Sequence, residues 1–140
     1  MNSPFETHAD RVVVDVWSDV MCPWCYVGAT VLDRAIKDFD HPVEVRHRSF
    51  LLVTDLSEGR TMPVTEVLTE FEGFSLEQAA AMNRQIGARA AELGLVFDHE
   101  ATLGTNTRTA HRLIHHATTH GLGHPMARRL FKAYFSDGLD

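Results

Sequence analysis

The alternation of apolar and polar residues divides the chain into a βαβ segment and a helical remainder. Residues 11–17 (RVVVDVW) are almost continuously apolar and rich in valine, which is typical of a strand buried on both faces. In residues 24–39 the apolar side chains recur at spacings of three and four, which predicts an amphipathic helix. Residues 43–50 (VEVRHRSF) alternate at first, which predicts a second strand. Residues 11–50 therefore predict a βαβ unit with a right-handed crossover.

The pattern after residue 50 predicts helices joined by loops, with residues 94–103 irregular or briefly extended and no strand-like run after them. Residues 51–63 are a polar stretch with Gly59 and Pro63, which predicts a loop. Ser75 and Gln78 match a capping box at the start of a helical run. The predicted helices cover residues 64–71, 76–93, about 107–120 and 125–135. Residues 1–10 are expected to form a loose arm, and residues 51–140 a helical domain.

Composition and charge narrow the class of protein. The chain has 140 residues, of which 44% are hydrophobic and 23% charged, as in one globular domain with a core. Its net charge of −6 argues against a nucleic-acid partner. The first ten residues carry Glu6 and Asp10 and no apolar segment of a secretory signal, and no apolar run approaches the ~20 residues that span a bilayer. We therefore expect a cytoplasmic protein with no membrane partner.

Cys22 and Cys25, the only cysteines, lie between the first predicted strand and the first predicted helix. In a reducing compartment this context favours a thiol–disulfide redox centre. The N-terminus of a helix favours an anion, so we expect a lowered pKa for Cys22 and a resolving role for the more buried Cys25. Pro23 and Trp24 would fix the turn and exclude water. No cofactor is expected beyond a redox-active Cys22–Cys25 disulfide.

The alternative chemistry for a Cys-x-x-Cys pair is zinc binding. The remaining ligands would have to come from the nine histidines, of which two pairs are spaced four residues apart: His111 with His115, and His116 with His120. Neither a second Cys-x-x-Cys pair nor an evident carboxylate completes a ligand set, so redox chemistry is favoured and no metal site is predicted. His111 is expected to be a partly buried, hydrogen-bonded side chain at a helix–helix contact.

Two separate motifs carry a family resemblance. Residues 15–28 (DVWSDVMCPWCYVG) resemble the active-site segment of DsbA-like thiol–disulfide oxidoreductases, most closely the FrnE-like subgroup. Asn106-Thr107-Arg108 and Ala110-His111-Arg112-Leu113 resemble a second segment of that subgroup. The resemblance implies an α/β thioredoxin fold with a helical domain inserted after the second strand. It also implies that Cys22 is the nucleophile, that Cys25 resolves, and that the partners are protein or small-molecule thiols and disulfides. The family includes isomerases that use glutathione, but these typically have serine at the first cysteine position.

The resemblance also implies that one part of the family's fold is missing from this sequence. In this family the chain returns from the helical insertion to supply a cis-proline loop, two more strands and a final helix. Here only residues 136–140 follow the helices, so the C-terminal part of the thioredoxin fold is expected to be missing. A two-stranded sheet is marginal by itself. The alternative hypothesis is therefore a catalytically incomplete fragment that acts as a binding module or is completed as a homodimer.

Several residues are predicted neighbours of the cysteines. Asp19, three residues before Cys22, is expected to relay protons or tune the thiolate, or else to form a turn or cap. Asn106, Thr107 and His111 belong to the second motif and could reach the active-site cleft, although N-capping also explains Asn106 and Thr107. Trp24 is expected either to form an apolar rim of the site or to pack against the helices. The other aromatic residues near the site or on the last helix are expected in the core: Tyr26, Phe131, Tyr134 and Phe135.

Overall fold

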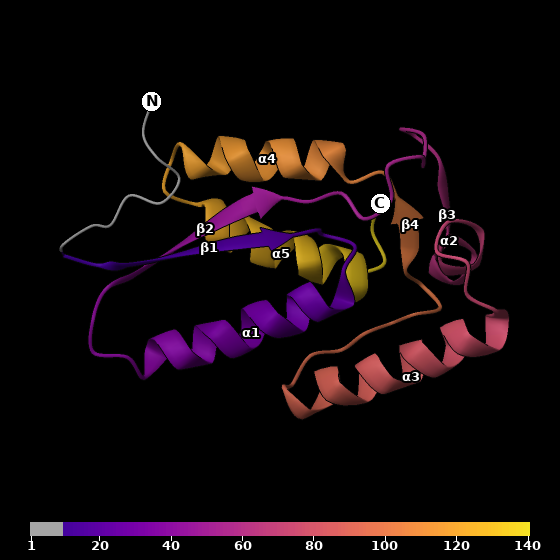
Figure 1. Ribbon diagram of the computed structural model, residues 1–140, viewed down its shortest axis with the longest axis horizontal. Helices are drawn as coiled ribbons and strands as arrows, with labels where there is room; N and C mark the ends of the chain where they lie inside the picture. Colours follow the sequence, from indigo (N-terminus) through magenta and orange to yellow (C-terminus); the bar gives the residue numbers. More distant parts are fainter. Residues whose placement is uncertain (1–9) are drawn as a thin grey trace.

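A computed structural model describes residues 10–140. All but the last residue of the predicted N-terminal arm lies outside this range. The described residues form five helices and four strands (Figure 1) in the order β1 (Val12–Ser18), α1 (Pro23–Lys37), β2 (Val43–Ser49), β3 (Thr61–Pro63), α2 (Val64–Glu70), α3 (Leu76–Glu92), β4 (Leu103–Thr105), α4 (Arg108–Thr118) and α5 (Gly123–Phe135). The α/β class predicted from the sequence is confirmed.

The strands β1 and β2 pair in parallel, with Val12 opposite Val43 and Ser18 opposite Ser49. Helix α1 makes the crossover between them and lies below the strands in Figure 1, whereas α4 lies above them. Proline is tolerated at the first position of a helix because its missing N–H would have no partner there, and Pro23 occupies that position in α1. The predicted βαβ unit is confirmed, and it places the cysteines at the turn from β1 into α1.

The prediction that only helices and loops follow β2 is wrong. Strands β3 and β4 form a second, antiparallel pair in which Met62 lies opposite Gly104. Each strand has three residues, too few to display a period of two, and each pairs with a segment about forty residues away along the chain. The local sequence therefore carried no signal for this sheet. Because β4 leads directly into Asn106 and Thr107, the sheet fixes where α4 begins.

The ends of the helices follow local chemistry. The capping box of α3 is confirmed, since the Ser75 hydroxyl accepts from the Gln78 N–H (3.1 Å) and the Gln78 side chain accepts from the Ser75 N–H (2.8 Å). Gly94 follows α3 with φ +76°, a left-handed conformation that suits glycine. Helix α5 begins at Gly123, two residues before the predicted start at Pro125. The first turn of a helix accommodates proline, so Pro125 does not need to be the first helical residue.

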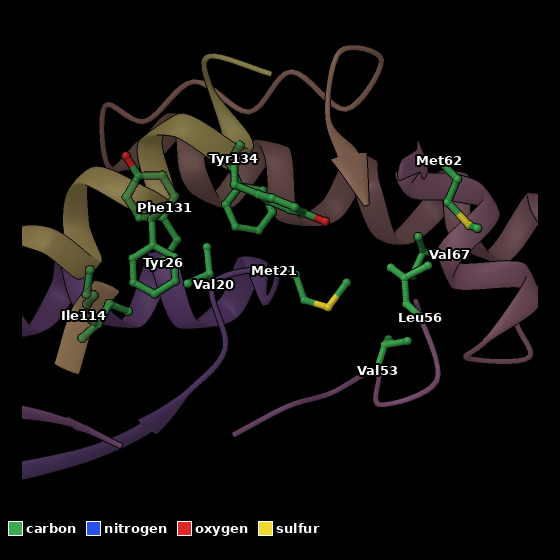
Figure 2. Packing of buried hydrophobic residues seen from close by; sticks show 13 residues of the cluster. Val20, Met21, Tyr26, Val53, Leu56, Met62, Val67, Ile114, Phe131 and Tyr134 are labelled. Atoms are coloured by element: carbon green, nitrogen blue, oxygen red, sulfur yellow. The ribbon is translucent and has the colours of Figure 1, made fainter. Parts of the chain in front are cut away.

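One apolar core extends across the predicted boundary between residues 50 and 51. Tyr26 of α1 stacks on Phe131 of α5 with ring centroids 5.3 Å apart, and Val20 and Ile114 lie around them (Figure 2). The predicted core positions Tyr26, Phe131, Tyr134 and Phe135 are all buried. Burying a large aromatic side chain stabilises a fold by roughly 1.5–3 kcal/mol, so this stack anchors α5 to the active-site helix. The division into two domains stays a prediction.

The close packing of β4 against α2 is expected to require glycine at position 104. A Cβ built at this position would overlap the Cγ2 of the buried Val67. Gly104→Ala should therefore lower the free energy of unfolding by about 1–3 kcal/mol in urea titrations.

Gly28→Ala is the matched control, because a Cβ at this helical position meets no atom within 4 Å. It should leave stability unchanged or raise it by up to about 1 kcal/mol. Equal effects of the two substitutions would contradict the close contact between β4 and α2.

Candidate active site

Cys22 and Cys25 stand at the N-terminus of α1. Cys22 is the N-cap residue, with extended backbone angles (φ −86°, ψ 112°), and its Sγ accepts a hydrogen bond from the Cys25 N–H at 3.3 Å. Both cysteines are half-buried and neither is in a disulfide. Sulfur thus takes the place usually filled by a serine or aspartate oxygen at an N-cap. The N–H and the dipole of α1 both stabilise negative charge on that sulfur.

The two thiols titrate as a pair. A hydrogen bond from the Cys22 thiol lowers the pKa of Cys25 to about 7, and the same bond together with burial raises the pKa of Cys22 far above its usual value. One thiol of the pair therefore ionises near neutral pH, and the second keeps its proton. Moving that proton from Cys22 to Cys25 places the charge on Cys22, where the N-terminus of α1 stabilises it. The sequence predicted a lowered pKa for Cys22 by itself. In the structure it is the first ionisation of the cysteine pair that has a low pKa.

Asp19 lies in the loop before the cysteines and is almost completely buried, with 1% of its surface exposed. Its carboxylate accepts hydrogen bonds from the Leu52 N–H (2.8 Å) and the Thr107 hydroxyl (2.7 Å). The third partner, Nε2 of His111 at 3.2 Å, must carry the proton because a carboxylate only accepts. Burial by itself raises the pKa of Asp19, but the hydrogen bonds from His111, Leu52 and Thr107 outweigh it, and the net pKa is lowered.

The structure therefore brings three predicted neighbours together: Asp19, Thr107 and His111. Asp19 does not cap a local turn, since its side chain bonds residues more than thirty positions away. Thr107 occupies the N-cap position of α4, but its hydroxyl binds Asp19 and makes no cap hydrogen bond. His111 is buried and hydrogen-bonded as expected, and its partner is Asp19 of the active-site loop. These corrections have one physical cause: a buried carboxylate needs donors, and only the tertiary fold supplies them.

Asn106 and Trp24 border the site without contacting Asp19. The Asn106 side chain donates to the Leu56 carbonyl (2.6 Å) and accepts from the first N–H of α4 (3.0 Å), so it fixes the turn before Thr107. Trp24 is 52% exposed and lines the cavity beside Cys22, in keeping with the apolar rim that was one of its two predicted places.

A cavity of about 260 Å³ opens beside Cys22. It lies between the active-site turn, α2 and α3, and its wall is mostly apolar. The lining side chains that contribute most to this character are Met21, Pro23, Leu52, Val64, Leu68 and Ile86. Glu72 is the single formally charged group in this wall, among the residues described. A cleft of this kind can hold the apolar part of a ligand next to the Cys22 sulfur.

The sequence analysis missed a second polar cluster, behind Cys25. His47 Nε2 lies 2.8 Å from His124 Nδ1, and His124 Nε2 lies 2.5 Å from a carboxylate oxygen of Asp33. Cys25, His47 and His124 line one cavity between α1, β2 and the start of α5. The inward position of His47 on an alternating strand was a signal for burial, but the partners come from distant elements and no local pattern connects them.

Zinc binding would require further ligands beside Cys22 and Cys25. Within residues 10–140, no group of three or more histidine, cysteine, aspartate or glutamate side chains could hold a metal ion. His115 bonds the Ser49 hydroxyl at 2.7 Å, and His116 and His120 face each other on the surface of α4. In the same part of the chain, none of the helices is both long and apolar enough to cross a membrane.

Comparison with known proteins identifies the family. The model of the DSBA-like thioredoxin domain matches residues 13–140. The chain belongs to this family. A solved structure of a probable DsbA oxidoreductase from Streptomyces coelicolor is 36% identical, with a TM-score of 0.81, over 91% of this chain and 56% of that one. The cytosolic disulfide reductase DsbM from Pseudomonas aeruginosa, with GSH, is 20% identical, with a TM-score of 0.55, over 91% of this chain and 57% of that one.

This DsbA-like chain thus spans little more than half the length of those structures. Comparison with curated proteins gives no match. The predicted DsbA-like family and thioredoxin fold are confirmed, whereas the FrnE-like subgroup stays a prediction.

Asp19 should make the stability of the protein depend on pH. A carboxyl with a lowered pKa in the folded state contributes stability above its ordinary pKa of 3.8, and that contribution is lost as the pH falls through the folded pKa. Asp19→Asn should therefore lower the free energy of unfolding by about 2 kcal/mol at neutral pH, with the difference shrinking below about pH 4.

Urea titrations of parent and variant between about pH 3 and pH 7 measure this difference. Asp98→Asn is the control, because Asp98 also accepts a backbone N–H (3.0 Å, from Ala101) but is exposed. Its effect should stay within about 0.5 kcal/mol. A pH-independent loss in Asp19→Asn would contradict the charged role of Asp19.

Proposed function

We propose that this DsbA-like chain catalyses thiol–disulfide exchange, with Cys22 as the attacking thiolate and Cys25 as the resolving thiol. The observation that carries the proposal is the position of Cys22 as N-cap of α1, where its Sγ accepts the Cys25 N–H. Two further observations support it. The pair has a first pKa near neutrality, and the cavity beside Cys22 gives a substrate access to that sulfur.

The reaction proceeds in two exchanges of sulfur partners. The Cys22 thiolate attacks a substrate disulfide, forms a mixed disulfide and expels one substrate thiolate. The Cys25 thiolate then attacks the Cys22 sulfur, which closes the Cys22–Cys25 disulfide and expels the second substrate thiolate. The substrate gains two electrons and two protons as dithiol, and the cysteine pair loses them. The reverse sequence oxidises a dithiol, and neither direction uses a cofactor beyond the redox-active disulfide.

The proposed substrates are protein or small-molecule disulfides with an apolar group beside the reacting sulfur, in keeping with the cavity wall. A FrnE-like identity and a cytoplasmic location are proposed from the sequence motifs and composition. Asp19, Thr107 and His111 are proposed as positioning residues, because they join the active-site loop to α4. Pro23, Trp24 and Asn106 are proposed to shape the rim and the adjoining turn.

A second candidate is a binding module that pairs with another copy of the chain. It is favoured by apolar side chains exposed near the ends of the two parallel strands: Trp17, Phe50 and Leu52. Sedimentation velocity should then show a dimer, and Trp17→Ser should shift it to monomer. A monomer at high concentration would remove this candidate.

Replacing Cys22 by serine is expected to abolish catalysis. A hydroxyl is not ionised at neutral pH, so Cys22→Ser should reduce the turnover of a model aromatic disulfide by more than about a thousandfold. Cys25→Ser, the matched control, keeps the nucleophile and should accumulate a mixed disulfide on Cys22, visible as added mass. Turnover by Cys22→Ser at the parental rate would refute the proposed function.

A further inference from the structure

We propose that His47, His124 and Asp33 form a proton relay that serves the resolving thiol Cys25. The inference rests on the proposed function and deepens it, because exchange requires Cys25 to lose its proton in the resolving step. The three side chains come from β2, α5 and α1, which lie next to one another in Figure 1. None of them belongs to the Asp19 cluster.

The hydrogen bonds run in one direction. The Asp33 carboxylate can only accept, so His124 carries its proton on Nε2, 2.5 Å from Asp33 Oδ1. In neutral His124 the other nitrogen, Nδ1, is an acceptor, and His47 donates to it from Nε2 across 2.8 Å. This leaves Nδ1 of His47 as an unprotonated acceptor, whose neighbour is the Ser18 hydroxyl at 3.5 Å. This unprotonated nitrogen therefore stands at the inner end of the hydrogen-bonded chain, with the Ser18 hydroxyl as its partner.

The inner residue of the relay, His47, lines a cavity that the resolving cysteine also lines. Cys25, His47 and His124 line the same cavity of about 260 Å³, which is large enough to admit water. Ser18, which contacts His47, directly precedes Asp19, whose backbone N–H bonds the Cys25 sulfur. His47 is 8% exposed, whereas the Asp33 side chain is 36% exposed. The relay thus leads from the cavity beside the half-buried Cys25 thiol to solvent.

The charges around His47 favour passing a proton onward. Burial and the proximity of His124 lower the pKa of His47 to about 4, with Asp33 opposing them. His47 is therefore neutral at neutral pH and does not retain a proton that it receives. Arg128 of α5 contacts the second Asp33 oxygen at 3.0 Å and keeps that carboxylate in place. The charged or titratable groups facing His47 from the packed elements are Cys25 and Asp33 of α1, His111 of α4 and His124 of α5.

The resolving step balances with the relay in place. The Cys25 thiol gives its proton through the cavity to His47 Nδ1, while its sulfur bonds the Cys22 sulfur and the bond from Cys22 to the substrate sulfur breaks. His47 releases its Nε2 proton to His124, and His124 releases its own to Asp33, which returns it to solvent. The expelled substrate thiolate takes up one proton from solvent, so no net proton is consumed. In the oxidising direction every transfer reverses.

The same hydrogen bonds also hold α5 against β2 and α1. The test therefore needs a measurement that would stay unchanged if these side chains only stabilised the fold. His124→Gln supplies it, because the amide can still donate to Asp33 but cannot gain a proton. A nitrothiobenzoate disulfide releases one coloured thiolate when Cys22 attacks and a second when Cys25 resolves. Stopped-flow absorbance separates the two phases.

At about pH 7 the second phase should be roughly tenfold slower in His124→Gln than in the parent, while the first phase is unchanged. The difference should vanish above about pH 9, where hydroxide removes the thiol proton. His115→Gln is the matched control, because His115 also bonds a β2 residue, Ser49, but lies outside the cavity. It should follow the parental pH profile. The relay would be overturned if the second-phase rate of His124→Gln followed the parental pH profile, or if it were reduced by the same factor at every pH.

Nuclear magnetic resonance of the parent protein gives a second test that involves no variant. If Cys25 exchanges its proton with the relay, the ring signals of His47 must titrate at different pH in the dithiol and disulfide forms. Identical titrations in a protein that does form the Cys22–Cys25 disulfide would refute the relay alone. Undiminished turnover by Cys22→Ser would refute the proposed function instead, so the two failures are distinguishable.

Discussion

The buried carboxylate of Asp19 is the constraint on which the arrangement of the site depends. An unpaired charge with 1% exposure would cost several kcal/mol, so the fold must deliver donors to it. They arrive from three places: the loop after β2, the residue before α4, and the first turn of α4 itself. These hydrogen bonds hold the active-site loop against α4. They also explain the need for β3 and β4, which position the start of that helix.

The cysteines stand between two polar clusters of different character. On one side Asp19 is charged and fully hydrogen-bonded, which makes it a rigid support for the loop. On the other side the His47–His124–Asp33 chain ends in an unprotonated nitrogen and extends to the surface, which makes it suited to moving a proton. The apolar cavity beside Cys22 adds a third environment, where a substrate can approach without displacing either cluster.

How far the sequence predicts the structure differs between residues for physical reasons. The Ser75–Gln78 capping box is local, with both partners within one turn, and its geometry followed the sequence. The hydrogen-bond partner of Thr107 and His111 could not be predicted in this way, because Asp19 is about ninety residues away, and Thr107 binds it in place of capping α4. His47 was not recognised as part of a site. The strand pattern predicts that its side chain is buried, but it does not predict that its partner is a histidine on α5.

The sequence by itself determined the βαβ unit, the N-terminal place of Cys22 on α1, the aromatic core positions and the DsbA-like family. These features depend on periodicity, on helix-end chemistry and on short motifs, all of which are encoded within a few neighbouring residues. Only the tertiary structure decided the shared proton of the cysteine pair, the donors to Asp19, the β3–β4 sheet and the histidine relay. Each of these requires groups from distant segments to meet in a buried place, where the loss of water makes their pairing decisive.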